Sequence, residues 1–366
     1  MYKISYAIPV VALIIAACIG IDPEYWWAYL LIVGAMEGLI GWAYYEFTRA
    51  KEYLSGYVTS VSHFFPWVEK VVKKETKYDE KGNSYTVEKV EYVEHPDEWN
   101  WSLNTGRSQS ISEYTFNRMC GIWQTGKYYF ETYQTNKVSG GGGESCHWNG
   151  IEEDTETVTY THKYKNPVRY SNSLFNSHFL TDNAQARQLG LFDYPAIHSN
   201  DQEVILYHKE LETPLEYEQA NIALQRLNAF MGKACQIHVF ILLFKAEQGM
   251  EIAQKQRDYW KGLNKNEFVV CLGVNGQEVE WCQALSWMDV PVLGVKTEAY
   301  FREYSFLDLL SFVKWLRENL DSWKRKEFKD FEYLGTNMSK GHNLSFWLIS
   351  LSLGLLVFFL CLIIGG

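Results

Sequence analysis

The densest group of residues that could do chemistry lies between positions 258 and 267. A carboxylate, an ammonium group, an indole and amides stand close together there, at Asp258, Trp260, Lys261, Asn264, Asn266 and Glu267. The hydrophobic pattern predicts that a helix gives way to a strand at this point, and side chains at such a connection can line a ligand groove. A capped, solvated turn uses the same residue types. The segment is therefore a candidate groove with two open interpretations.

Cysteine and histidine offer a second kind of chemistry. Cys146 and His147 are adjacent, but zinc sites combine ligand pairs that are two to four residues apart. We therefore predict no metal and no cofactor. The seven cysteines contain no CxxC pair, which favours reduced thiols over a disulfide framework. A Cys-His nucleophile cannot be assigned from the sequence, because it depends on spatial pairing.

Composition narrows the class of protein. The chain has 366 residues, 47% of them hydrophobic, and a net charge of -10 at pH 7. Such a chain can bury a sizeable core, which excludes a disordered or collagen-like protein. The acidic balance argues against a nucleic-acid partner, because phosphate backbones attract Lys and Arg.

Three apolar runs predict membrane spans. Residues 4–21 carry no charge, residues 25–47 are interrupted by Glu37 and then Glu46, and residues 344–364 end close to the C-terminus. Each run can cross about 30 Å of hydrocarbon as a helix. The first two runs predict a helical hairpin and the third predicts a C-terminal anchor, so the lipid bilayer is the first expected partner.

Charge near the spans predicts their direction. Lys3, Arg49, Lys51 and Lys340 flank one side, whereas the connection at 22–24 is acidic. The positive-inside rule then places the large soluble region in the cytoplasm of a multi-pass protein of the cell membrane. The alternative is a lipoprotein signal that ends at Cys18, but a second span follows almost at once and favours a retained helix.

Glu37 is the only charged residue well inside a predicted span. It lies between Gly34 and Gly38, and Gly41 follows one turn later. Gly34 and Gly38 form a GxxxG step that permits close helix approach. A carboxylate at this depth is neutral, paired or facing a polar interior. We expect helix packing or oligomerisation here, and the alternative is an ion or proton site in a small transport or channel component.

Residues 51–200 have a strand-like pattern. Alternation over 68–78 and 85–93 around a turn predicts a long, solvent-exposed hairpin. Ser110 or Ser112 can cap a helix that runs to Trp123. Residues 127–138 and 156–165 are further predicted strands, the latter with polar residues on both faces, which is typical of an edge strand.

Residues 216–320 predict an α/β sandwich with a mixed sheet. The expected order is a helix over 220–232, a strand over 236–244, a helix over 249–263, a hairpin of two strands over 268–274 and 277–285, and a helix over 306–320. Asn275 and Gly276 provide the hairpin turn. In that register Cys271 and Cys282 lie on one face of the sheet, as small buried side chains.

This order, with the turn Tyr259-Trp260-Lys261-Gly262 and the entry Asn264-Lys265-Asn266-Glu267 before a hydrophobic strand, resembles the TPM-domain family of membrane-anchored α/β modules. The resemblance covers about 100 of the 366 residues. Acidic metal-binding loops that some members have are not clear here, so the resemblance implies the fold and leaves a phosphatase-like activity without support.

The segment 323–331 alternates basic and aromatic residues, which is typical of contact with an anionic membrane surface. Its residues of interest are Trp323, Lys324, Arg325, Lys326 and Lys329.

Together these features predict a membrane α+β protein. The expected parts are a two-helix transmembrane hairpin (1–50), a β-rich soluble region (51–200), an α/β domain (201–335) and a C-terminal transmembrane helix (336–366). We expect a membrane-anchored interaction or scaffold module that associates with itself or with another membrane protein. The alternative is a membrane-bound hydrolase that uses the candidate groove.

Overall fold

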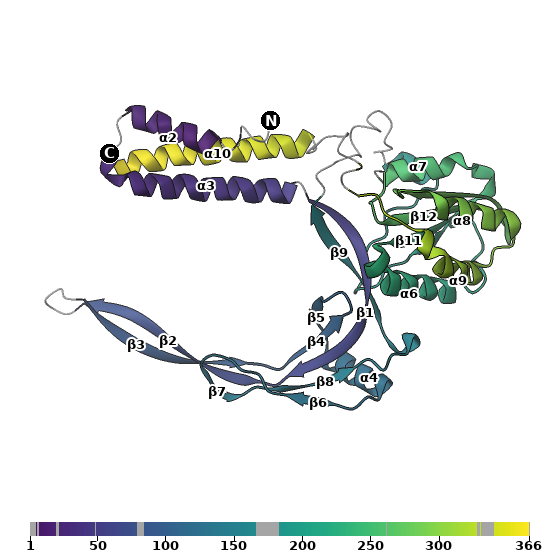
Figure 1. The fold of residues 1–366 in the computed structure, drawn as a ribbon, viewed down its shortest axis with the longest axis horizontal. Coiled ribbons are helices and arrows are strands. Elements are labelled where there is room, and N and C mark those ends of the chain that lie inside the picture. Colours follow the sequence, from purple (N-terminus) through teal and green to yellow (C-terminus); the bar gives the residue numbers. More distant parts are fainter. Residues whose placement is uncertain are drawn as a thin grey trace.

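The structure, a computed structural model, describes residues 5, 7–19, 22–47, 49–78, 84–165, 183–260, 262–327, 330 and 340–365. Three apolar helices form a bundle at one end (Figure 1): α2 (Ala7–Ile19), α3 (Trp26–Phe47) and α10 (Lys340–Gly365). Gly354 of α10 lies against Ile8 of α2, where an added Cβ would stand 2.5 Å from the Ile8 side chain. Two helical segments, Trp26–Phe47 and Leu344–Ile364, are long and apolar enough to cross a membrane.

In the described residues, the first soluble part consists of strands, one α-helix and the short 3-10 helix Glu152–Asp154. It contains β1 (Arg49–Phe64), β2 (Trp67–Tyr78), β3 (Ser84–His95), β4 (Glu98–Leu103), β5 (Ser108–Ser110), α4 (Glu113–Trp123), β6 (Tyr128–Phe130), β7 (Lys137–Gly140), β8 (Gly143–His147) and β9 (Thr157–Lys165). The order of the larger sheet is β5-β4-β1-β8-β6, with β9 paired to the first half of β1. The long hairpin β2–β3 and the short β7 form a separate sheet that projects from this part (Figure 1).

The second soluble part is an α/β domain. It contains α5 (Asn183–Gln188), β10 (Ile205–Tyr207), α6 (Tyr217–Cys235), β11 (His238–Lys245), α7 (Glu251–Tyr259), β12 (Glu267–Asn275), β13 (Glu278–Ser286), α8 (Val292–Glu303) and α9 (Leu309–Asn319). The sheet order is β10-β11-β12-β13, in which only β13 is antiparallel to its neighbour. Strands β11 and β12 are almost fully buried, as their unbroken apolar runs require.

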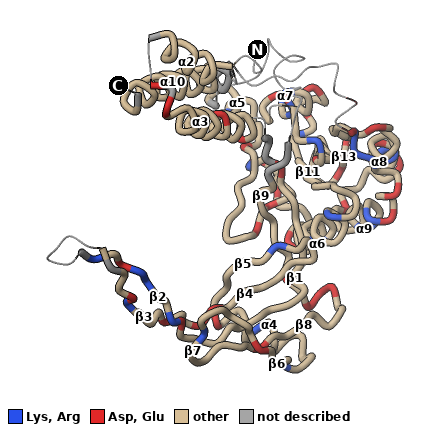
Figure 2. The backbone as a smooth tube through the Cα atoms, turned by 60° about the vertical axis from the view of Figure 1, so that its left-hand side comes forward, with Lys and Arg blue, Asp and Glu red and all other residues tan. Residues whose placement is uncertain are grey.

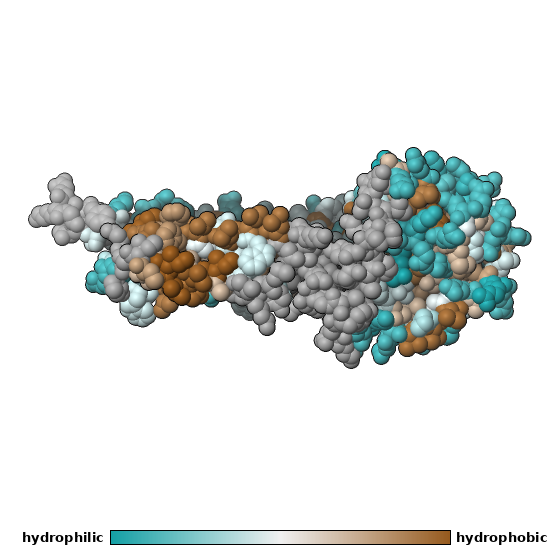
Figure 3. Space-filling view, turned by 90° about the horizontal axis from the view of Figure 1, so that it is seen from above, coloured by the Kyte–Doolittle hydropathy of each residue, from teal (hydrophilic) through white to brown (hydrophobic). Residues whose placement is uncertain are grey.

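Surface character separates the helix bundle from the α/β domain. Figure 3 shows hydrophobic side chains over the bundle and a largely hydrophilic surface over the domain. Acidic and basic residues are spread along the backbone of the soluble parts, including both strands of the β2–β3 hairpin (Figure 2). The helices and strands of the two soluble parts together form the mixed α+β class that the sequence predicts.

Most predicted elements of the soluble parts are present. The hairpin over 67–95 and the helix capped by Ser112 form as expected, and Ser112 Oγ accepts a hydrogen bond from the Thr115 backbone N–H at 3.1 Å. The predicted strand over 127–138 is instead two short strands, β6 and β7. Helix α8 was not predicted, and Ala186 and Leu191 belong to the core of the α/β domain, which therefore begins before residue 201.

The predicted register of the β12–β13 hairpin is wrong. Asn275 pairs with Glu278, so the turn consists of Gly276 and Gln277 rather than of Asn275 and Gly276. Val274 pairs with Val279 but Gly273 pairs with Trp281, so the ladder also shifts between these positions. Beyond this bulge Cys271 faces Gln283, and Cys282 faces Leu272. Because neighbouring residues of a strand point to opposite faces, Cys271 and Cys282 lie on opposite faces of the sheet rather than on one face.

The expectation of reduced thiols is wrong for one pair. Cys120 of α4 and Cys146 of β8 form a disulfide, with Cα atoms 5.5 Å apart. The bond ties the helix to the sheet of the β-rich part, next to the small core around Val61, Phe116 and Met119. The chain therefore contains a covalent staple that cysteine spacing alone did not identify.

Candidate functional site

The candidate groove lies where the first half of β1 passes the starting ends of β11 and β12. Asn264 and Asn266 precede β12, and Glu267 is its first residue. Asn266 and Glu267 have no exposed surface, and Lys265, which precedes Asn266, is 1% exposed. The segment is thus not a solvated turn, and its polar atoms must find partners inside the protein.

Glu267 is surrounded by donors from its own domain. The Tyr194 hydroxyl donates to Oε1, the Asn264 side-chain amide donates to Oε1 at 2.6 Å, and the Asn264 backbone N–H donates to Oε2 at 2.7 Å. Burial raises the pKa of the Glu267 carboxyl, and the three donors oppose this shift. The pKa of Tyr194 lies well above its usual value because its hydroxyl is desolvated beside that carboxyl. Both oxygens of Glu267 are therefore occupied by groups of the same chain.

Asn266 joins this cluster to the strand that comes from the helix bundle. Its side-chain amide donates to the backbone carbonyl oxygen of Tyr53 on β1 at 2.7 Å. The Tyr53 ring packs against the rings of Tyr194 and His238, with centroids 5.3 Å and 6.3 Å away. A residue predicted to line a groove thus holds two parts of the molecule together.

His238 is the first residue of β11 and lies at the junction, which is the contact of β1 with the starting ends of β11 and β12. It is fully buried, and its Nε2 lies 3.0 Å from Gln202 Oε1. Gln202 in turn donates to the Pro195 carbonyl oxygen at 2.9 Å. Burial lowers the pKa of His238 to about 3, so the imidazole is neutral and donates through Nε2. Its Nδ1 is a buried polar atom without a hydrogen-bond partner in the described part of the chain.

A charged group lies on the neighbouring side of β1. Glu52 is buried and pairs with Arg325 at 3.2 Å and with His162 of β9 at 3.0 Å. Nearby, burial and the Arg325 guanidinium lower the pKa of Lys265 to about 8, while Glu52 opposes the shift. Arg325 therefore contributes to the same junction as Asn266, from a different segment.

Residues 323–327 of the basic segment contact the α/β domain. Trp323 is buried and donates through its indole N–H to the Cys235 carbonyl oxygen at 2.9 Å. The Lys326 backbone N–H bonds to the Trp287 carbonyl oxygen, and Lys324 forms an exposed ion pair with Asp289 at 3.0 Å. Lys329 lies outside the described residues.

The remaining residues of the candidate groove are split. Trp260 is buried and donates to the Phe192 carbonyl oxygen at 2.8 Å, and Gln256 of α7 bonds to both backbone groups of Phe192. Asp258 lies on α7 and has an interaction within the protein. Lys261 lies outside the described residues. The sequence therefore located a buried polar junction but not an open groove.

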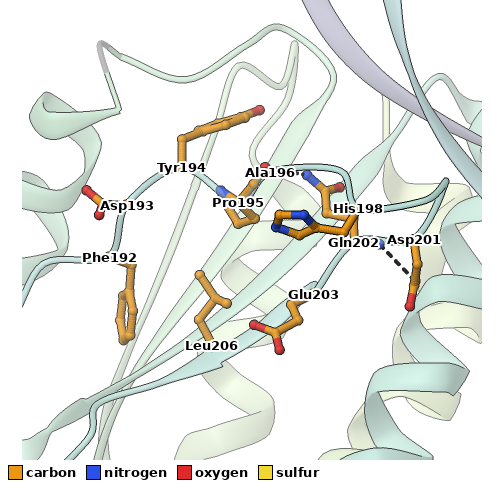
Figure 4. Close-up of a pocket in the computed structure, with 10 residues that line it drawn as sticks. All are labelled: Phe192, Asp193, Tyr194, Pro195, Ala196, His198, Asp201, Gln202, Glu203 and Leu206. Atoms are coloured by element: carbon orange, nitrogen blue, oxygen red, sulfur yellow. Dashed lines mark hydrogen bonds between the residues drawn. The ribbon is translucent and has the colours of Figure 1, made fainter.

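A cavity of about 600 Å³ lies beside the junction. It is lined by the segment before β10 and by one residue of β10 itself: Phe192, Asp193, Tyr194, Pro195, Ala196, His198, Asp201, Gln202, Glu203 and Leu206. Phe192 and Leu206 lie at one end and His198 and Asp201 at the other (Figure 4). Tyr194 and Gln202 belong to both the cavity wall and the junction, so their bonds to Glu267 of β12 and His238 of β11 fix the position of this wall.

The candidates that the sequence predicts within a membrane span lie on α3. Gly34 and Gly38 are exposed, and no described atom lies within 4 Å of an added Cβ at either position. Glu37 and Gly41 are half-buried. The GxxxG step therefore does not mediate packing against the described helices of the same chain, where Gly354 provides the close approach instead.

Sequence reasoning missed Tyr53, Tyr194, Gln202 and His238. They come from three segments that are remote from 258–267, and no local pattern links them. Among the described residues there is no group of three or more His, Cys, Asp or Glu side chains that could hold a metal ion. The polar groups of the cluster bond to one another rather than to a ligand. They join a buried carboxyl, a phenol and amides across two parts of the molecule.

No protein-family model matches the chain, and searches of the curated proteins and of the solved structures found no match either.

Proposed function

We propose that this protein is a membrane-anchored scaffold in which β1 holds the two soluble parts in a fixed arrangement beside the bilayer. The observation that carries the proposal is the hydrogen bond from Asn266 to the Tyr53 carbonyl oxygen, at the buried start of β12. An interaction module needs a defined geometry between its surfaces and its anchor. The buried polar groups at 264–267 serve that geometry, because their bonds connect the α/β domain to the strand that follows α3.

The path of β1 supports this function. Its first half pairs with β9 and its second half with β4 and β8, so one strand runs through both halves of the β-rich part. Helix α6 packs on β1 and also on the sheet of the α/β domain. Phe230 of α6 stacks on Tyr57 of β1, with ring centroids 4.1 Å apart. Apolar packing and polar bonds thus act on the same strand.

We place the soluble region of this scaffold in an oxidising compartment, with the helix bundle as a multi-pass anchor. The Cys120–Cys146 disulfide supports this side, because disulfides persist in oxidising environments and are rare in the cytosol. The charge bias favours the opposite side. Two measurements decide between the two sides of the membrane. One is protease digestion of sealed vesicles from each face, and the other is alkylation of free thiols before and after reduction. Cleavage only from the cytoplasmic face, with Cys120 alkylated without reductant, would contradict this placement.

Distance measurements test the scaffold itself. Spin labels on non-natural amino acids at Lys74 of the hairpin and Val295 of α8 report the arrangement of the soluble parts in the full chain in nanodiscs. We expect one narrow distance distribution. Asn266→Ala should broaden it, because the bond to β1 is lost. Asn275→Ala, which removes an exposed bond to Glu280 in the β12–β13 turn, is the matched control and should not.

Two outcomes would count against the scaffold. A broad distribution in the unsubstituted chain would mean that the soluble parts move independently. Turnover of a phosphomonoester that Tyr194→Phe or Glu267→Gln abolishes, with the distance distribution unchanged, would favour a hydrolase instead.

A further inference from the structure

The β2–β3 hairpin has two open edges. Strand β7 covers β2 only from Trp67 to Glu69, and within the described ranges no strand pairs with the outer edge of β3. Each strand has 12 residues and spans about 40 Å. Two-stranded ribbons are at best marginally stable, and open edges are templates for further pairing. A hairpin of this length therefore gains stability from any strand that joins its sheet.

The two edges carry opposite charge. Strand β2 has four lysines against two glutamates, and β3 has three glutamates against one lysine. The β2 lysines are Lys70, Lys73, Lys74 and Lys77, and the β3 glutamates are Glu88, Glu91 and Glu94. A further strand beside β2 should thus be acidic, and one beside β3 should be basic.

The pairing inside the hairpin shows that the two strands fit each other. Lys73 lies 2.5 Å from Glu91, and Lys74 lies 3.6 Å from Glu88. Val72 pairs with Val90, and these side chains are 43% and 44% exposed. In the same register, β3 of a second copy could extend the sheet at the free edge of β2, with the same ion pairs and a continuous row of valines.

We propose that copies of this chain assemble side by side through the β2 edge of one copy and the β3 edge of the next. This inference rests on the proposed scaffold function and names its partner. The contact is heterologous, so it repeats from copy to copy and closes into a ring or continues as a row. Antiparallel β2–β3 pairing between copies points all hairpins in the same direction, as anchorage in one bilayer requires. Pairing of β2 with β2 would place lysines together, and pairing of β3 with β3 would place glutamates together.

Disulfide trapping tests the contact directly. One chain carries Val72→Cys, and a second, differently tagged chain carries Val90→Cys, so that neither chain can form the bridge within itself. Reconstituted together in liposomes and oxidised, they should give a cross-linked product that contains both tags. Each variant alone should give no more product than the unsubstituted chain, whose own thiols define the background. A cross-link in the Val72→Cys chain alone would indicate β2–β2 contact and overturn the proposal.

A charge swap tests the electrostatic selection. The chain with Lys73→Glu, Lys74→Glu, Glu88→Lys and Glu91→Lys keeps opposite charges within its own hairpin, so folding is preserved. It should self-associate like the unsubstituted chain. In mixtures, association between the two chains should fall by about thirtyfold, because like charges face each other at the contact. Equal co-assembly of the two chains would overturn the proposal.

The mass of the full chain in nanodiscs separates this inference from the scaffold function. A mass of several times 42.7 kDa, together with the trapped disulfide, supports the contact. A single-copy mass with a narrow label distance would overturn the self-association and leave the scaffold intact. A multiple mass without the trapped disulfide would also overturn it, because association would then occur elsewhere.

Discussion

The two soluble parts of this protein differ in where they use their polar groups. In the α/β domain, Glu267, Asn266 and His238 are buried and directed at neighbouring segments of the same chain. In the β-rich part, the β2–β3 hairpin exposes lysines and glutamates along two free edges. The comparison indicates that one part fixes the internal geometry of the molecule, whereas the other presents a surface to its surroundings.

The largest difference is expected between two glutamate substitutions. Glu267→Ala leaves the Tyr194 hydroxyl and two Asn264 donors buried without an acceptor and opens a cavity, which should lower the free energy of unfolding by about 4 kcal/mol. Glu91→Ala removes two exposed ion pairs, to Lys73 and Lys89, and should leave the unfolding midpoint unchanged. Urea unfolding of the full chain in detergent, followed by tryptophan fluorescence, measures both. If the two substitutions lowered the free energy of unfolding equally, the two parts would not differ in how they use their polar groups.

The disulfide should have the next largest effect, confined to the β-rich part. Its residues are 26 positions apart, and loss of the bond should destabilise this part by about 3 kcal/mol through the entropy of the unfolded chain. Reductant should therefore lower the unfolding midpoint of the unsubstituted chain but not of Cys120→Ala/Cys146→Ala. Cys235→Ala, which removes a free thiol, is the control. A midpoint that does not respond to reductant would contradict this role.

A smaller effect concerns acid and His238. Its folded-state pKa of about 3 lies below the ordinary value. The neutral imidazole therefore contributes its full share of the unfolding free energy above pH 6.5, and this share is lost as the pH falls. Glu267 acts in the opposite sense, because a raised pKa removes stability as the pH rises above the ordinary carboxyl range. The difference in unfolding free energy between the unsubstituted chain and His238→Gln isolates the histidine. It should change by about 2 kcal/mol between pH 7 and pH 5.

Val295→Ala, which changes an exposed apolar residue of α8, is the control for this measurement and should keep the pH dependence of the unsubstituted chain. A His238→Gln chain with the same pH dependence as the unsubstituted chain would show that the imidazole titrates normally.

Local patterns predicted the elements and the buried segment, but not the partners. Apolar periodicity located α6, β11 and β12, and the run of polar residues at 258–267 marked the start of β12. The partners Tyr53 and Tyr194 lie 213 residues before Asn266 and 73 residues before Glu267, respectively, so only the folded chain brings them together. The hairpin register failed because the turn lies one residue further along, at Gly276-Gln277, and because the ladder shifts by one residue at Gly273, which strand alternation does not reveal. The resemblance to the TPM-domain family stays a prediction.

Hydrogen exchange of backbone amides tests most directly whether the junction couples the anchor strand to the α/β domain. In the full chain in nanodiscs, we predict that Asn266→Ala increases exchange in the first half of β1 as well as at the start of β12, while Asn275→Ala changes neither. If exchange in Asn266→Ala increased only in β12 and β1 kept its protection, the strand would be held without the junction. The scaffold account would then be contradicted.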